Sequence, residues 1–251
     1  MSGHSKWSTI KRKKGAEDAK RGKLFTRLAR EIMMAAREGG ADPEANSSLR
    51  LAIDKAKDNN MPKDNIERAI QRGAGVGDGA DAVEEILYEG YGPHGVALII
   101  TVVTDNRNRT LADLKYVFNR TGGNLATSGA VTWQFNQKGY IEIDRAGADY
   151  EEVFLVAAEA GAEDVQEEDE SLVIYTPRED LGAVVRTLRE SGYKLTEAEL
   201  IWMPTNEVEL ETNQAMQVMS MIEKLEDLDD VQNVASNLRL TDEIAAAFEA
   251  A

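Results

Sequence analysis

The 251-residue chain contains no cysteine and only two histidines, His4 and His94. The absence of cysteine excludes disulfides, thiolate zinc sites, iron–sulfur clusters and cysteine nucleophiles, and two histidines cannot form a three-histidine metal site. No stretch approaches the roughly 20 apolar residues that a membrane-spanning helix needs. The first residues also lack the apolar core of a secretory signal peptide. We therefore expect a soluble cytoplasmic protein with no membrane partner, metal ion or cofactor.

Catalytic motifs are missing as well. No serine lies in a Gly-x-Ser-x-Gly elbow, and no His-Glu-x-x-His metal signature is present. His94 follows Gly92-Pro93 in a predicted turn, where a lone histidine is usually a surface residue. Acidic pairs are numerous, but adjacent carboxylates do not converge on one face of a helix. The sequence therefore predicts a protein that is not an enzyme and takes no small-molecule substrate.

Negative charge dominates the chain but is unevenly distributed. The whole sequence has 29 basic and 45 acidic side chains, a net charge of −16. Residues 1–75 carry 17 basic and 10 acidic side chains, and the first 30 residues carry 10 basic and 2 acidic ones. Residues 133–204 carry 6 basic and 17 acidic side chains. This asymmetry indicates a basic end that meets a polyanion and an acidic body that faces a basic partner or is repelled by phosphate.

Residues 1–20 show no apolar period, so we expect a flexible basic arm. Nucleic-acid binding needs cations for phosphates and flat π-surfaces for unpaired bases. Lys6 and Trp7 could hold a phosphate and stack on an unpaired base; a solvated tail without a specific partner is the alternative. The candidate binding residues of the arm and the first helix are His4, Lys6, Trp7, Lys11, Arg12, Lys13, Lys14, Lys20, Arg21, Lys23 and Arg27.

A second polar cluster occupies residues 105–110, after a predicted buried strand. Asp105 and Asn106 could bond local amides in a capped turn. Arg107 and Arg109 flank the same turn and could bind a phosphate or the backbone of ribosomal RNA. Both interpretations stay open.

Three short helices are predicted between residues 21 and 75. The first ends at Gly39-Gly40, Asp42 before Pro43 predicts the N-cap of the second, and Pro62 opens the third. The third helix could serve as a DNA recognition helix, although it lacks a clear helix-turn-helix signature. For such a role it offers Lys63, Arg68, Gln71 and Arg72.

Strands and helices alternate after a glycine-rich linker. We predict strands at 86–91, 96–103 and 131–135, with a helix capped by Thr110 before the last of them. Residues 139–202 follow the β-α-β-β-α-β order of a ferredoxin-like unit. The tail predicts a strand at 207–211, a helix at 212–226 and a strand at 231–237.

These patterns predict an α+β protein with an N-terminal three-helix domain followed by two α/β domains, at least one of them ferredoxin-like. The tail has too few elements to form a core alone, so we expect it to join the middle domain. The predicted divisions are a flexible basic arm (1–20), a helical domain (21–75), a discontinuous α/β middle domain (80–132 plus 205–251) and an inserted ferredoxin-like domain (133–204).

Several motifs resemble those of the YebC family. They include Gly3-His4-Ser5-Lys6-Trp7, Asn60-Met61-Pro62, Tyr88-Glu89-Gly90-Tyr91-Gly92-Pro93 and Asp105-Asn106-Arg107-Asn108-Arg109-Thr110. The resemblance runs from Gly3 to the tail, and His94 stands where glycine is usual. The family includes a mitochondrial translational activator of cytochrome oxidase. The resemblance implies three domains and a cytoplasmic regulator of gene expression that is not an enzyme.

The resemblance also implies a nucleic-acid partner, and here two descriptions compete. Family members are described as DNA-binding transcriptional regulators and as ribosome-associated translation factors that ease difficult peptide sequences such as proline runs. The charge pattern favours the translation factor, because a basic, aromatic-bearing arm can enter an RNA cavity while acidic faces meet basic ribosomal proteins. The alternative is a DNA-binding transcriptional regulator. The expected partners are ribosomal RNA, the ribosome or DNA.

Overall fold

The structure, a computed structural model, describes residues 6–7, 10, 18–75, 83–146, 148–168 and 171–250, without the side chains of residues 18–21. The chain divides into two compact units. The first unit comprises residues 31–77 and 137–202, and the second comprises residues 2–30, 78–136 and 203–251. The domain boundaries expected from the sequence stay a prediction.

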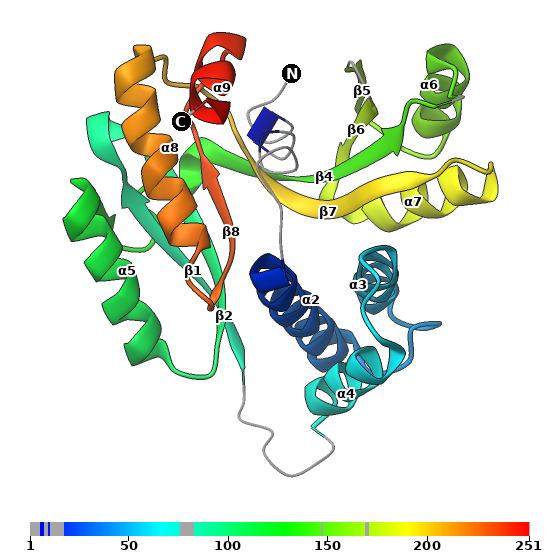
Figure 1. The fold of residues 1–251 in the computed structure, drawn as a ribbon. Coiled ribbons are helices and arrows are strands. Elements are labelled where there is room, and N and C mark those ends of the chain that lie inside the picture. Colours follow the sequence, from blue (N-terminus) through cyan, green and yellow to red (C-terminus); the bar gives the residue numbers. More distant parts are fainter. Residues whose placement is uncertain are drawn as a thin grey trace. The chain divides into compact units, whose positions relative to one another are not determined.

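Three helices lie between Asp18 and Gly73, a part of the chain that the structure describes throughout (Figure 1). They are α2 (Asp18–Gly39), α3 (Ser47–Asp58) and α4 (Lys63–Gly73). The buried residues of α3 are Leu49, Ala52, Ile53 and Ala56, which have the spacing of one helix face. Pro62 stands at the N-cap of α4, which confirms the predicted start of that helix.

The start of helix α3 was predicted wrongly. Asn46, not Asp42, is the N-cap, and its side-chain oxygen accepts from the Leu49 amide at 3.0 Å. The Asn46 amide also donates to the carbonyls of Ala35 and Gly40 at 2.7 and 2.8 Å. An aspartate has no donor for these two bonds. Asp42 instead accepts from the Glu44 amide within the preceding turn.

The ferredoxin-like part contains a four-stranded sheet with the order β5-β6-β4-β7 (Figure 1). Its chain order is β4-α6-β5-β6-α7-β7, as the sequence predicted. Strands β4 and β6 pair antiparallel, with Tyr140 opposite Tyr175. The elements are β4 (Phe135–Asp144), α6 (Tyr150–Glu159), β5 (Asp164–Glu167), β6 (Ser171–Pro177), α7 (Leu181–Glu190) and β7 (Leu195–Pro204).

The other sheet has the order β3-β1-β2-β8, and its last strand comes from the tail. Alternate residues of β2 contact helices α5 and α8 in one core, so both helices cover the same face (Figure 1). Helix α9 was not expected from the sequence. The elements are β1 (Glu84–Tyr91), β2 (Ala97–Thr104), α5 (Arg107–Thr121), β3 (Asn124–Ala126), α8 (Thr212–Glu226), β8 (Val231–Ser236) and α9 (Asp242–Glu249).

Residues 131–135 do not form the predicted strand. A 3₁₀ turn covers Thr132–Gln134, and β4 begins only at Phe135. The cause is Glu89 on β1, whose buried carboxylate accepts from the amides of Gly129, Val131 and Thr132 at 2.6, 2.7 and 3.0 Å. These amides are therefore unavailable for a strand ladder. The predicted strand at 207–211 is reduced to one bridge, between Val208 and Leu238.

The turn between β1 and β2 holds His94 in a backbone conformation that is uncommon for residues other than glycine. His94 has φ 61° and ψ 17°, in the left-handed region that glycine adopts without steric cost. The imidazole Nε2 lies 3.0 Å from the Gln217 side-chain oxygen, so the ring is held by helix α8. The turn therefore accommodates a histidine at a backbone conformation suited to glycine.

Candidate nucleic-acid interface

Part of the predicted basic arm lies outside the described residues. This applies to His4, Lys11, Arg12, Lys13 and Lys14. Lys20 and Arg21 belong to the first turn of α2, but their side chains are also outside the described part. The structure does place Lys6, Trp7, Lys23, Arg27, Arg107 and Arg109.

Trp7 packs on the body of the second unit. Its indole N–H donates to the Glu226 carboxylate at 3.2 Å, and its ring centroid lies 5.6 Å from that of Phe248. Ile10 is only 2 % exposed and belongs to the same core, whereas the sequence indicated too little apolar surface for packing here. The Lys6 ammonium lies 2.7 Å from the Asp242 carboxylate. Sequence reasoning missed these partners because they lie 219 and 236 positions away.

The cations of helix α2 contact residues Glu226, Asp227, Asp229 and Asp230, which we call the acidic segment 226–230. Lys23 donates to the Asp227 carbonyl at 2.7 Å and to its carboxylate at 3.1 Å. Arg27 donates to the Glu226 carbonyl at 3.2 Å. Arg30 donates to the Asp229 carbonyl and to the Asp230 carboxylate, the latter at 2.8 Å. The acidic segment thus binds Lys23 and Arg27, two of the side chains that the sequence assigned to nucleic-acid binding.

Asp230 is the centre of a buried polar network. The residue is 4 % exposed and accepts from the hydroxyls of Thr110 and Thr104 at 2.7 and 3.1 Å. Its carboxylate also lies 2.8 Å from the guanidinium groups of both Arg30 and Arg109. Burial by itself would raise the pKa of Asp230, but the bonds from Thr110 and Arg109 and the two positive charges bring the pKa below its usual range.

The Asp230 network includes Arg109 and Thr110 of the polar cluster at residues 105–110. Asn106, not Thr110, is the N-cap of helix α5, and its side chain accepts from the Arg109 amide at 3.1 Å. The Thr110 hydroxyl is directed to Asp230 instead and is buried. Arg109 also bonds Asp105 at 2.8 Å, and Arg107 lies 3.2 Å from Glu84. The capped-turn interpretation therefore describes the local geometry, and phosphate binding by Arg107 and Arg109 stays a prediction.

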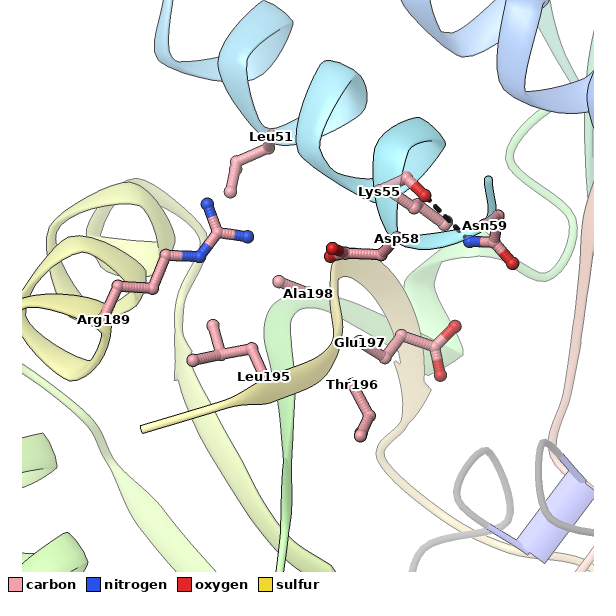
Figure 2. A pocket seen from close by; sticks show the side chains of 9 residues that line it. All are labelled: Leu51, Lys55, Asp58, Asn59, Arg189, Leu195, Thr196, Glu197 and Ala198. Atoms are coloured by element: carbon pink, nitrogen blue, oxygen red, sulfur yellow. Dashed lines mark hydrogen bonds between the residues drawn. The ribbon is translucent and has the colours of Figure 1, made fainter. Parts of the chain in front are cut away.

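A small pocket in the first unit lies between helix α3 and strand β7 (Figure 2). The Lys55 ammonium lies 2.6 Å from Glu199 and 3.4 Å from Glu31. Burial by itself would lower the pKa of Lys55, but these carboxylates raise the pKa above its usual range, which favours the charged form. The remaining lining residues are Leu51, Asp58, Asn59, Arg189, Leu195, Thr196, Glu197 and Ala198.

No group of three or more histidine, aspartate or glutamate side chains among the described residues could hold a metal ion. Within the same residues, no helix is long and apolar enough to cross a membrane.

Comparison with known families identifies both parts of the chain. The family described as the TACO1/YebC protein N-terminal domain matches residues 5–76. The family described as the TACO1/YebC second and third domain matches residues 83–238. The chain belongs to the TACO1/YebC family. The resemblance drawn from the sequence motifs is therefore confirmed.

Relatives in the TACO1/YebC family match this chain over almost its full length. A protein of Dehalococcoides mccartyi is 50 % identical over 244 residues, covering 97 % of each chain. A protein of Trichlorobacter lovleyi is 52 % identical over 241 residues, covering 96 % of this chain and 97 % of its own. Both are named "Probable transcriptional regulatory protein", a name that describes a regulator and not an enzyme.

A solved structure shares the fold. The crystal structure of a conserved hypothetical protein from Aquifex aeolicus superimposes with a TM-score of 0.84 at 46 % sequence identity. The match covers 90 % of this chain and 93 % of that protein. The α+β architecture, with an N-terminal three-helix domain followed by two four-stranded sheets with helices, is therefore shared with the Aquifex aeolicus protein.

Proposed function

We propose that this chain is a non-enzymatic, nucleic-acid-binding regulator of gene expression. The observation that carries the proposal is the segregation of charge, with 10 basic and 2 acidic side chains in the first 30 residues of a chain whose net charge is −16. A cationic end can neutralise phosphates while the acidic body limits non-specific contact. The residues proposed to contact nucleic acid are His4, Lys6, Trp7, Lys11, Arg12, Lys13, Lys14, Lys20, Arg21, Lys23, Arg27, Arg107 and Arg109.

Transcription is the process that the names of the relatives support. In this form of the proposal the target is duplex DNA, and helix α4 supplies the residues that read a groove. Four of its side chains are exposed and thus accessible to DNA, namely Lys63, Arg68, Gln71 and Arg72.

Translation is a second candidate, favoured by the acidity of the body. In this form the chain binds ribosomal RNA through its basic end and eases the synthesis of difficult sequences such as proline runs. Residues 133–204, with 6 basic and 17 acidic side chains, would be repelled by a long duplex but attracted by basic ribosomal proteins.

The proposal is tested by measuring the affinity of the full chain for labelled duplex DNA and for a labelled RNA hairpin at several salt concentrations. The key variant replaces Lys11, Arg12, Lys13 and Lys14 with glutamine. If the arm contacts phosphate, the slope of log K against log salt becomes shallower by about 3, since each contact contributes about 0.7–0.9. Substitution is preferable to deletion of residues 2–20, because Ile10 is part of the core.

The same titrations separate the two candidates. Tighter binding to duplex DNA supports the transcriptional form, whereas preference for RNA together with co-sedimentation with ribosomes supports the translational form. The wild-type chain binding neither nucleic acid, or a quadruple variant with an unchanged salt slope, would contradict the proposal.

A further inference from the structure

Helix α5 presents an exposed face that combines two cations with an aromatic ring. Tyr116 is 65 % exposed, and Lys115, Asn119 and Arg120 are exposed around it. The opposite face of the helix is buried, with Leu114, Val117 and Phe118 in the core. The exposed side chains are therefore held on a helix that is anchored along its length, and the ring is not needed for packing. None of the four was among the residues proposed from the sequence.

The spacing of these residues gathers them into one patch, which we call the α5 patch (Lys115, Tyr116, Asn119 and Arg120). Residues four apart on a helix are neighbours on its surface. Lys115 is therefore next to Asn119, and Tyr116 is next to Arg120. The ring thus has a cation on either side of it on the exposed face of the helix.

The two cations of the α5 patch are free to bind an external anion. No carboxylate of the described residues lies within ion-pairing distance of Lys115 or Arg120, in contrast to Arg107 and Arg109 in the first turn of the same helix. The one acidic residue of helix α5 is Asp113, which precedes the patch. A phosphate would therefore not have to displace a bonded carboxylate from either cation.

We propose that the α5 patch binds an unpaired stretch of RNA. Lys115 and Arg120 contact successive phosphates, Tyr116 stacks on the base between them, and Asn119 can hydrogen-bond a 2′-hydroxyl. This inference rests on the proposed nucleic-acid-binding function and adds to it a second contact site, separate from the basic arm.

Two features favour an unpaired strand over a duplex. In a duplex the bases are stacked on each other, so an exposed tyrosine ring has no base to contact. A duplex also carries twice the phosphate charge of a single strand along its axis. A patch with two cations on a body of net charge −16 suits the less charged ligand.

The test measures binding of the full chain to a labelled 12-nucleotide single-stranded RNA by fluorescence anisotropy. The double variant Lys115→Gln/Arg120→Gln should bind about tenfold more weakly at low salt, since two phosphate contacts are lost. Tyr116→Ala should weaken binding by about five- to tenfold, whereas Tyr116→Phe, which keeps the ring, should bind like the wild type. Thermal unfolding followed by circular dichroism checks that each variant is folded.

Matched controls identify what a loss of affinity means. Arg186→Gln/Lys194→Gln removes the same charge from two exposed cations of the other unit and should leave RNA affinity unchanged. An equal loss in this control would overturn the proposal, because net charge alone would then explain the effect. The same labelled sequence as single-stranded DNA and as a duplex completes the set, and equally strong binding of either, with the same sensitivity to Tyr116→Ala, would overturn the assignment to unpaired RNA.

The outcome also separates this inference from the proposed function. Wild-type protein that binds no nucleic acid removes both. Wild-type protein that binds RNA while the α5 variants bind equally well removes only the α5 patch and leaves the basic arm as the contact.

Discussion

Four cations near the N-terminus each donate to a carboxylate or a carbonyl in the C-terminal part of the chain, and we call them the paired set: Lys6, Lys23, Arg27 and Arg30. Lys115 and Arg120, the free set, have no carboxylate of the described residues within ion-pairing distance. The two sets look alike in the sequence, since both are basic residues on helices or in a basic segment. They differ in what the fold places beside them. Affinity for phosphate therefore depends on the pairing of each cation and not only on the local count of charges.

The difference has an energetic basis. The charge of a cation bonded to a carboxylate within the protein is already partly neutralised, so the cation gains less from contacting a phosphate. A free cation gives up only water and small ions, whose release favours binding. The paired set thus stabilises the fold, and the free set is better placed to bind an external anion. Substitutions in the paired set should therefore affect mainly stability, and substitutions in the free set mainly affinity.

The largest effect is expected where the paired set is most buried. Asp230→Ala removes the carboxylate that accepts from Thr104, Thr110, Arg30 and Arg109. Removing one partner of a buried pair costs about 3–5 kcal/mol, because the other groups lose their partner and stay buried. Arg109 is partly exposed, so we expect a value near the lower end, about 3 kcal/mol, in urea unfolding.

Asp229→Ala is the matched control, because it removes an exposed aspartate one position away. Its side chain is not needed for Arg30, which bonds the Asp229 backbone carbonyl. The control should lie within about 0.5 kcal/mol of the wild type. Similar losses in the two variants would show that Asp230 does not hold the network together.

Acid is expected to lower the free energy of unfolding. The pKa of Asp230 is lowered from its usual 3.8, and the pKa of Glu89 is lowered from its usual 4.5 despite burial, by hydrogen bonds from the residue 129–132 turn. A lowered pKa in the folded state means that the stabilisation is complete above the usual value and is lost as the pH falls through the folded value. The free energy of unfolding should therefore be steady from pH 6 to 5 and decline below about pH 4.5.

Asp230→Asn distinguishes the source of this decline. An amide does not titrate in this range, so the variant should be less stable at pH 6 but lose less stability between pH 5 and pH 3. Urea midpoints at each pH measure both quantities. A variant whose stability falls as steeply as that of the wild type would assign the acid sensitivity to other carboxylates.

Much of the fold could be predicted from local sequence patterns. The buried faces of α3 and α4, the β-α-β-β-α-β order and the strand at 231–236 follow from apolar spacing, which acts over a few residues. Two of the errors involve a side chain bonded to a distant partner. Glu89 holds residues 129–132 in a turn, and Thr110, whose helix is capped by Asn106, bonds Asp230.

The candidate site was harder to predict, for the same reason. Position in the sequence shows that Lys23, Trp7 and Arg109 are basic or aromatic, but not that Asp227, Glu226 and Asp230 lie beside them. The α5 patch had a local signal, namely basic, aromatic and polar residues at positions 115, 116, 119 and 120, outside the helix's apolar stripe. Only the structure shows that its cations are unpaired.

The smallest effects on stability are expected when one cation is removed from each set. Lys23→Gln loses an exposed ion pair and a bond to the Asp227 carbonyl, so it should cost at most about 1 kcal/mol of unfolding free energy. Lys115→Gln removes no bond to a described residue and should change the free energy of unfolding by less than about 0.5 kcal/mol. RNA affinity should show the reverse order, with the larger loss at Lys115, because Asp227 already neutralises part of the Lys23 charge. Equal effects of the two substitutions on both stability and affinity would mean that pairing within the protein does not decide which cations bind.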